Sequence, residues 1–365
     1  MSSGFSRRGF LGLSLGSTAC LILEQSTRAE LPWLAETQRP PETIVDAPDL
    51  SPLLVDREGR SINTLDGWQV RRKELRRSWC EILRPLPLDR GAPPAFEVLD
   101  EEYVGGIVRQ HVRYEVEPSV ETEAFLLKPA HHTEPVPGII VLHSTVPHCL
   151  YQPAGLAGPP EKHFGLRFAQ QGYVTLCPRN FLWPNNRHID TNRTVAEFQR
   201  RHPGCTGMAK MLWDAQRGVD VLAHHSEVDA ARLGAVGHSL GAKEVLYLSA
   251  FDERIRVSVS SEGGVGTRFS NWDAPWYLGD AIKAPDFARE HHELLALCAP
   301  RAFLLVGGNS ADGDQSWPFI DAALGVYRLY GESPRLGLYN HKQGHNVPPQ
   351  AAERIGEWFR EYLPV

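Results

Sequence analysis

The chain has 365 residues, a formal net charge of −6 at pH 7 and 42% hydrophobic residues. This length allows one large α/β domain with extensions or two smaller domains, and the hydrophobic content argues against a disordered chain. The mildly acidic balance contains no basic stripe, so we do not expect nucleic acid as a partner.

The first segment, residues 1–29, has the features of an export signal. Arg7 and Arg8 lie between a polar start and a short apolar run from Phe10 to Leu23. Paired arginines before such a run are typical of twin-arginine signals, which carry folded proteins across the bacterial inner membrane. The run is too short and too rich in glycine and serine to span a bilayer. We expect cleavage near Ala29 and a periplasmic or extracellular protein without a stable membrane span.

Residues 30–95 are predicted to form an N-terminal arm and a helix. The part from 30 to about 63 is rich in proline and polar residues, and residues 67–83 have helical spacing with a basic face. We interpret those basic residues as a solvated or salt-bridged face of the helix. The catalytic domain is expected to follow, from residue 96 to residue 365.

In residues 96–365, strand and helix patterns alternate. Helices are predicted at 208–223, from Gly241 onward and at 351–362, with others between the later strands. The apolar run at 138–144 is continuous, as in a parallel strand buried on both faces. This rhythm predicts an α/β fold with a mostly parallel central sheet covered by helices on both faces. The strand patterns are found at 96–103, 106–116, 123–130, 138–144, 173–179, 232–239, 255–262, 301–308 and 335–341.

Five cysteines remain after removal of the signal, and none has CxxC spacing. Cys80, Cys177 and Cys298 lie in apolar stretches and are expected in the core. Cys149 and Cys205 lie in loop-like stretches. An oxidising compartment would permit a disulfide between them, and the sequence leaves this open.

A tight turn is predicted around Ser239, in the run Gly237-His238-Ser239-Leu240-Gly241. A strand pattern leads into the turn and a helix pattern leaves it, which is the context of a nucleophile elbow. Glycines are needed there because the serine backbone is strained and because strand and helix approach closely. The free amides at the start of the helix favour developing negative charge. We predict that Ser239 is a nucleophile rather than a serine that only caps the helix.

A nucleophilic serine needs a base, and in this class of fold the chain order is nucleophile, acid, histidine. Two histidines follow the last predicted strand, and we favour His345, just before the closing helix, over His341. Two carboxylates are candidates for the acid that orients the imidazole. Glu262 follows the strand after the nucleophile helix, whereas Asp312 follows the next strand, which is the more usual place. The residues alone leave this choice open.

Ester cleavage also needs two donors for the oxyanion. One is expected to be the backbone amide of Leu240, directly after the nucleophile. The other is expected from the loop after the apolar strand at 138–144, near Ser144 or Thr145. Loss of one such donor typically costs ~10²–10³ in rate, so this loop matters as much as the nucleophile.

Several tryptophans lie in loops that are expected to rise beside the strand ends. Aromatic faces at such a place suit a sugar ring, although loop tryptophans often only fix the loop. The sequence leaves both interpretations open. The tryptophans are Trp183, Trp272, Trp276 and Trp317, and the last three are our candidates for substrate binding.

No metal or cofactor is expected. The histidines that occur as neighbours lack metal-site spacing such as H-E-x-x-H, and adjacent side chains on a helix or strand do not point the same way. Serine-dependent ester cleavage requires no cofactor. The neighbouring pairs are His131-His132, His224-His225 and His291-His292.

These motifs resemble those of the α/β-hydrolase superfamily, and within it the glucuronoyl esterases and related bacterial esterases. The likeness extends from Phe125 to Tyr362 and is strongest at 237–243, 261–264 and 291–305. It implies that Lys243 contacts a sugar hydroxyl, and it favours Glu262 over Asp312 as the acid. Glucuronoyl esterases usually carry arginine directly after the nucleophile, where this chain has Leu240. A looser resemblance to acetyl xylan esterases and dienelactone hydrolases survives that difference.

The expected function is that of a serine-dependent carboxylic ester hydrolase that acts through an acyl-enzyme on a carbohydrate-linked ester, of the glucuronoyl or acetyl type. Alternatives are a serine peptidase of the prolyl-oligopeptidase kind and a non-catalytic binding protein on the same fold. The segment before the catalytic domain is too short for the propeller of those peptidases. The oligomeric state does not follow from the sequence.

Overall fold

The computed structural model describes residues 32–44, 47–331 and 333–365. The predicted export signal at residues 1–29 lies outside these described residues. Within the described ranges, no helix has the length and apolar character needed to cross a membrane.

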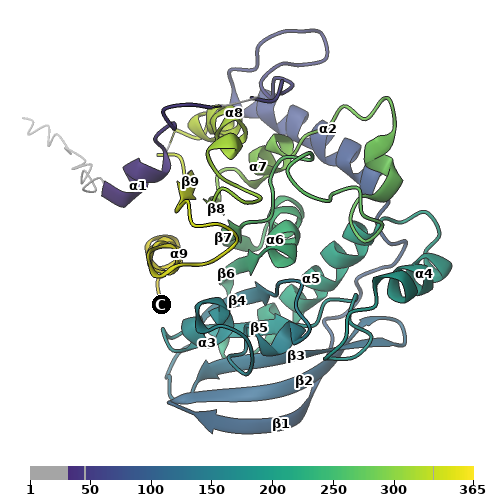
Figure 1. Cartoon of the computed structure of the whole chain (residues 1–365), viewed down its shortest axis with the longest axis vertical. Helices are drawn as coiled ribbons and strands as arrows, with labels where there is room; N and C mark the ends of the chain where they lie inside the picture. Colours follow the sequence, from purple (N-terminus) through teal and green to yellow (C-terminus); the bar gives the residue numbers. More distant parts are fainter. Residues whose placement is uncertain (1–31, 45–46, 332) are drawn as a thin grey trace, which may run out of the picture.

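Within the described residues, one nine-stranded sheet forms the centre of the molecule, in the order β1-β2-β3-β5-β4-β6-β7-β8-β9 (Figure 1). The first three strands pair antiparallel, β3 is also antiparallel to β5, and all later neighbours are parallel. The predicted mostly parallel sheet is thereby confirmed. The strands are β1 Phe96–Val104, β2 Ile107–Glu117, β3 Val120–Pro129, β4 Val136–Leu142, β5 Val174–Pro178, β6 Val228–His238, β7 Ile255–Ser261, β8 Ala302–Gly307 and β9 Leu336–Asn340.

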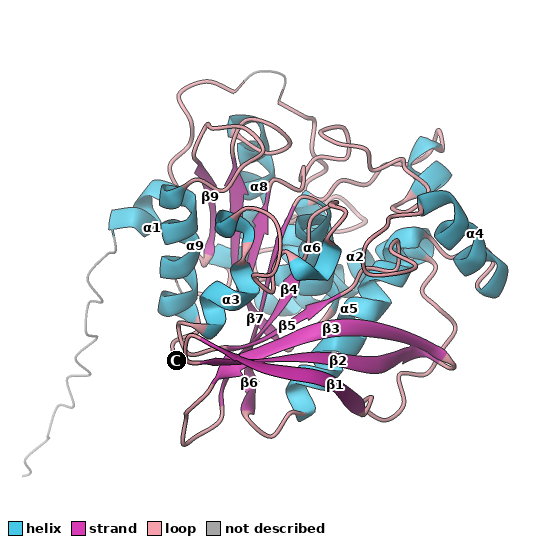
Figure 2. Cartoon of the chain, turned by 60° about the horizontal axis from the view of Figure 1, so that its bottom comes forward, coloured by secondary structure: helices cyan, strands magenta, loops and turns pink. Residues whose placement is uncertain are grey.

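Helices cover both faces of the sheet, as predicted. In Figures 1 and 2, α3 and α9 lie on one face, and α5 and α6 lie on the other. The α-helices of the described residues are α1 Pro32–Thr37, α2 Leu65–Leu83, α3 Phe164–Ala169, α4 Thr191–Arg201, α5 Gly207–His224, α6 Leu240–Phe251, α7 His292–Cys298, α8 Trp317–Arg328 and α9 Pro349–Tyr362. Short 3₁₀ turns are η1 Cys149–Tyr151, η2 Pro160–Lys162, η3 Gly279–Lys283 and η4 Asp314–Ser316.

Helix α6, which follows Ser239, is enclosed by other elements. All of its residues are buried, because it packs on β6 and β7 with α5 and α7 around it. Its first turn is therefore held in place from every direction.

The N-terminal arm and helix pack against the main body of the protein. Trp79 of α2 is buried, and its indole N–H donates to Glu293 Oε2 at 2.8 Å. The same ring stacks on His291, with the ring centroids 5.2 Å apart. Gln38 of the arm donates to the Leu336 carbonyl on β9 at 3.1 Å. The boundary at residue 95 stays a prediction.

The two cysteines for which a disulfide was left open are free thiols in this structure. Cys149 Sγ donates to the Asn186 carbonyl at 3.2 Å, and Cys205 Sγ lies 3.7 Å from the Pro85 carbonyl. Each thiol thus has a separate local partner. Cys177 and Cys298 are buried, as expected for core residues, and Cys80 is partly buried.

Candidate active site

Ser239 lies at the apex of the turn between β6 and α6, as the sequence predicts. Its backbone is strained, with φ 60° and ψ −116°, a region that residues other than glycine rarely adopt. Its N–H donates to the Ser261 carbonyl at 2.8 Å, which ties the turn to the end of β7. Strain of this kind persists only where the surroundings enforce it, and it is common at active sites.

The two glycines around Ser239 are required by space. A Cβ at Gly241 would lie 2.0 Å from the carbonyl oxygen of Leu142, and one at Gly237 would lie 2.4 Å from the backbone of Gly241. The start of α6 is thus pressed against the end of β4. This close approach brings the free amides at the start of α6 beside the loop that follows β4.

Glu262 is the carboxylate that contacts His345. The His345 Nδ1 lies 3.2 Å from Glu262 Oε2, and the Glu262 side chain is fully buried whereas that of His345 is 43% exposed. Glu262 also has a positive φ of 56° and follows β7 directly. Because Nδ1 faces the carboxylate, Nε2 on the other side of the ring is left to exchange a proton.

Each candidate acid lies in one of the two loops after β7 and β8 and accepts backbone N–H groups of the other loop. Glu262, after β7, accepts the backbone N–H of Gly308 and that of Ala311, the latter at 2.7 Å. Asp312, after β8, accepts the N–H groups of Gly264 and Val265, each at 2.7 Å. Asp312 also accepts the Ser316 hydroxyl at 2.9 Å, and burial raises its pKa. In this geometry Asp312 holds the loop of Glu262 and has no contact with the histidine.

Ser239 and His345 line one pocket of about 290 Å³ at the carboxyl ends of the parallel strands. Among the contacts of the described residues, no hydrogen bond joins the Ser239 hydroxyl to the imidazole. Such bonds are often long without substrate and shorten when it binds. His341, the other histidine considered, is largely buried and accepts the Gln343 N–H on Nδ1 at 3.1 Å.

The two candidate oxyanion positions after β4 face different ways. Thr145 lines the pocket together with Ser239 and Leu240. Ser144 is buried, and its hydroxyl lies 3.3 Å from Nδ1 of His238. Leu240 is the first residue of α6, where backbone N–H groups have no partner within the helix. Leu240 and Thr145 thus line the pocket beside Ser239, whereas the Ser144 hydroxyl lies against His238.

Lys243 lines the same pocket but lies mostly below its surface, with 4% of its area exposed. Its Nζ donates to the Gly263 carbonyl at 2.5 Å and lies 4.0 Å from the ring centroid of Trp272 and 5.1 Å from that of Tyr277. Burial lowers the pKa of this amine to about 7. Lys243 can donate to a ligand in the pocket while it supports the Glu262 loop.

The structure separates the tryptophans that the sequence grouped together. Trp276 lines the pocket and is available to a ligand. Trp272 is fully buried behind Lys243, and its N–H donates to the Gly264 carbonyl at 2.7 Å. Trp317 begins α8 and packs in the core, so the expected contact of Trp272 and Trp317 with substrate does not fit their positions. Trp183 is buried as well and supports a loop.

Sequence reasoning missed a large part of the pocket wall. The pocket residues that it did not identify come from two long connections, between β5 and α4 and between β7 and α7. No pattern marks such residues, because irregular loops have no periodicity to show which side chains face inward. They are the apolar Leu182 and Ile189 and the polar or aromatic Ser270, Asn271 and Tyr277.

Among residues 32–44, 47–331 and 333–365, no group of three or more His, Cys, Asp or Glu side chains is arranged to hold a metal ion. The paired histidines have other contacts. His132 Nε2, for example, lies 2.8 Å from Glu227, and His291 Nε2 accepts the Tyr247 hydroxyl at 2.8 Å.

Comparison with known sequences gives two matches of limited extent. The sequence model of the dienelactone hydrolase family matches residues 122–285. A 4-O-methyl-glucuronoyl methylesterase from Cerrena unicolor is 27% identical over 125 residues, which cover 27% of this chain and 26% of that protein. The match thus spans about a quarter of the relative's length.

Solved structures resemble the chain over most of its length. A glucuronoyl esterase from Teredinibacter turnerae superimposes with a TM-score of 0.65 and 22% identity, covering 86% of this chain and 89% of that one. One from Solibacter usitatus gives 0.65 and 19%, covering 86% and 97%. A putative acetyl xylan esterase from Bacteroides fragilis gives 0.60 and 17%, covering 86% and 87%. The chain therefore has the α/β-hydrolase fold, as its sequence motifs indicated.

Proposed function

We propose that the protein is a serine-dependent carboxylic ester hydrolase that acts through an acyl-enzyme. The observation that carries this proposal is the meeting of three remote segments in one pocket: the strained turn at Ser239, the carboxylate of Glu262 and the imidazole of His345. A binding protein would have no need of a serine in a strained turn beside a histidine that is paired with a buried acid.

In the proposed mechanism His345 removes the proton of Ser239 as the serine oxygen attacks the ester carbonyl. The amides of Leu240 and Thr145 hold the negative oxygen of the tetrahedral intermediate. Glu262 stabilises the charged imidazole, which then gives its proton to the departing alcohol. Water attacks the acyl-enzyme by the same steps, with His345 as base, and releases the acid. No cofactor is needed for this sequence.

We propose a carbohydrate-linked ester, glucuronoyl or acetyl, as the substrate. The pocket combines an aromatic face, Trp276, with the polar side chains of Lys243 and Asn271, as a sugar ring requires. The glucuronoyl esterases and the putative acetyl xylan esterase among the structural neighbours support this class. Leu240 takes the place where glucuronoyl esterases usually have arginine. The resemblance to acetyl xylan esterases does not depend on that arginine, so an acetyl ester is compatible with Leu240.

We also propose that the protein is exported through a twin-arginine signal and works outside the cytoplasm. The support is the pair Arg7-Arg8 before the apolar run that ends at Leu23. A polymeric plant ester would be accessible only there.

The proposed function is tested by hydrolysis of 4-nitrophenyl acetate, methyl glucuronate and acetylated xylan. The wild-type protein is expected to cleave at least one carbohydrate ester, and Ser239→Ala is expected to lose activity by ~10⁴-fold or more. Ser270→Ala, which also changes a hydroxyl in the pocket wall, is the matched control and should keep most of the activity. Equal turnover of wild type and Ser239→Ala would refute the assignment.

A further inference from the structure

His143 lies directly after β4, buried beneath the loop that carries Thr145. Its Nε2 accepts the backbone N–H of Asn180 at 3.1 Å, and its Nδ1 lies 2.8 Å from the Ser144 carbonyl. Because Nε2 is an acceptor, the ring proton is on Nδ1 and is donated to that carbonyl. Burial lowers the pKa of His143 to about 4, so the ring stays neutral at pH 7.

The bond to the Ser144 carbonyl fixes the direction of the next amide. The carbonyl and the N–H of a trans peptide point in opposite directions. Since the Ser144 carbonyl faces the His143 ring, the N–H of Thr145 points away from that ring. Thr145 lines the pocket beside Ser239, on the side of the reacting group.

Trp183 fixes the peptide between Val146 and Pro147, one residue beyond Thr145. Its indole N–H donates to the Val146 carbonyl at 3.0 Å, and its ring packs edge-on against His143 with the centroids 4.6 Å apart. The carbonyls of Ser144 and Val146, the two residues that flank Thr145, are thus both bound to buried rings. One short segment after β5, residues 180–183, supplies both the Trp183 ring and the Asn180 N–H that donates to His143.

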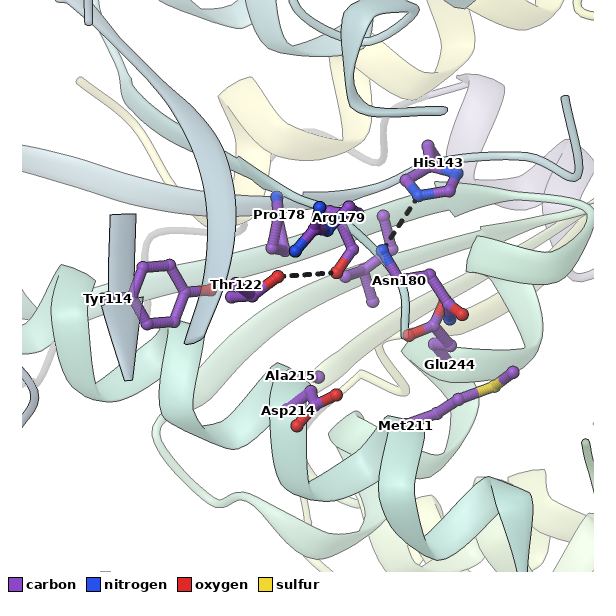
Figure 3. Close-up of a pocket in the computed structure, with 11 residues that line it drawn as sticks. Tyr114, Thr122, His143, Pro178, Arg179, Asn180, Met211, Asp214, Ala215 and Glu244 are labelled. Carbon is purple, nitrogen blue, oxygen red and sulfur yellow. Dashed lines mark hydrogen bonds between the residues drawn. The ribbon is translucent and has the colours of Figure 1, made fainter. Parts of the chain in front are cut away.

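Asn180 connects this arrangement to the nucleophile helix (Figure 3). Its side-chain amide donates to Glu244 Oε1 at 3.0 Å, and its side-chain oxygen accepts the N–H of Leu182 at 3.0 Å. Glu244 lies on α6, in the same helix that begins at Leu240. His143, Asn180 and Glu244 border a small cavity of about 10 Å³, which has room for roughly one water molecule.

We infer that His143 is a positioning residue for acyl transfer: held by Asn180, it directs the Thr145 amide at the oxygen of the acyl group. This inference rests on the proposed function, because an oxyanion forms only if Ser239 attacks an ester. His143 touches neither substrate nor nucleophile. Its effect is on the geometry of a donor, which matters most in the transition state.

The test compares His143→Leu, His143→Asn and a matched control, His292→Leu, by kcat and KM for 4-nitrophenyl acetate. His292 is fully buried and its Nε2 contacts the Ser51 carbonyl, away from the pocket. We expect His143→Leu to lower kcat roughly 10- to 100-fold, with KM changed by about twofold or less. His143→Asn should recover most of kcat, because its amide can donate to the Ser144 carbonyl. His292→Leu should keep kcat.

Two outcomes would overturn the inference: a kcat of His143→Leu equal to that of His292→Leu, or no recovery in His143→Asn when it is folded. If His143→Leu does not fold, Trp183→Phe is the second variant, since it keeps a ring and removes only the donor to Val146. An unchanged kcat in Trp183→Phe would then contradict the inference. If Ser239→Ala abolishes turnover while these variants have no effect, the proposed function stands and only the positioning role fails.

Discussion

The pocket joins two regions that differ in how firmly the chain holds their side chains. The anchored side, which comprises Ser239 and Glu262, lies at strand ends: the Ser239 N–H donates to the Ser261 carbonyl, and buried Glu262 accepts two backbone N–H groups. The His345 loop, residues 341–348, presents an imidazole that is 43% exposed and has one polar contact to the anchored side. Groups that stabilise charge need fixed geometry. His345, in contrast, must reach both the Ser239 oxygen and the oxygen of the departing alcohol as it transfers a proton.

Removal of the exposed imidazole is expected to have the largest effect on activity. His345→Ala should lower kcat for 4-nitrophenyl acetate by ~10⁴-fold, because the serine loses its base while the anchored side stays intact. His341→Ala is the matched control from the same loop. If His341→Ala caused the larger loss, the assignment of the base would be wrong.

Glu262→Gln tests the contact between the two regions. We expect kcat to fall by ~10²–10⁴, since an amide cannot stabilise the charged imidazole or hold its tautomer. Asp312→Asn is the comparison variant: it should lower the free energy of unfolding by ~1–3 kcal/mol, because one acceptor of a backbone N–H is replaced by a donor. Its loss of kcat should be smaller than that of Glu262→Gln. The reverse order in steady-state assays would make Asp312 the acid.

Lys243→Met tests whether the pocket also binds a sugar. We expect KM for a carbohydrate ester to rise roughly tenfold, because one hydrogen bond from the amine is lost. The KM for 4-nitrophenyl acetate, which has no hydroxyl for the amine, should change less. An equal effect on both substrates would restrict Lys243 to its contact with the Gly263 carbonyl.

Glu244→Gln is expected to change the pH dependence of stability rather than kcat. Burial raises the pKa of Glu244 to about 8, with the nearby Asp214 adding to the rise and Asn180 opposing it. The unfolded chain releases this proton at lower pH, so the stability of the wild type should fall as the pH rises from about 4.5 to about 8. Each pKa unit corresponds to about 1.4 kcal/mol.

The measurement is urea unfolding of wild type and Glu244→Gln at pH 5 and pH 8. The variant should gain stability relative to the wild type at the higher pH, because glutamine has no proton to lose. A difference between the two proteins that is the same at both pH values would show that Glu244 does not titrate in this range.

The sequence was most informative where a motif and a geometric requirement coincide. The position of Ser239 at a tight turn was predictable because strand and helix patterns meet there. The flanking Gly237 and Gly241 are needed at this turn, because a Cβ at either position would collide with backbone atoms. The parallel sheet followed from the alternation of apolar runs and helical spacing. These features depend on neighbours in sequence.

The rest depends on neighbours in space. Glu262 and Asp312 follow adjacent strands in similar loops, and only the fold shows that one carboxylate faces His345 and the other faces backbone amides. Trp272 and Trp317 were expected at the pocket because their loops were expected to lie beside the strand ends. Both rings are buried instead, because other side chains pack on them. A signal for His143 existed, since polar residues at the carboxyl end of a buried strand point to a site.

We propose that Ser239 is an activated nucleophile whose base is His345. Labelling of the folded protein with a fluorophosphonate, followed by peptide mass spectrometry to locate the label, tests this proposal. We expect one label on Ser239 in the wild type and a much slower reaction in His345→Ala. An unlabelled Ser239 in a preparation that hydrolyses 4-nitrophenyl acetate, or equal labelling in His345→Ala, would contradict it.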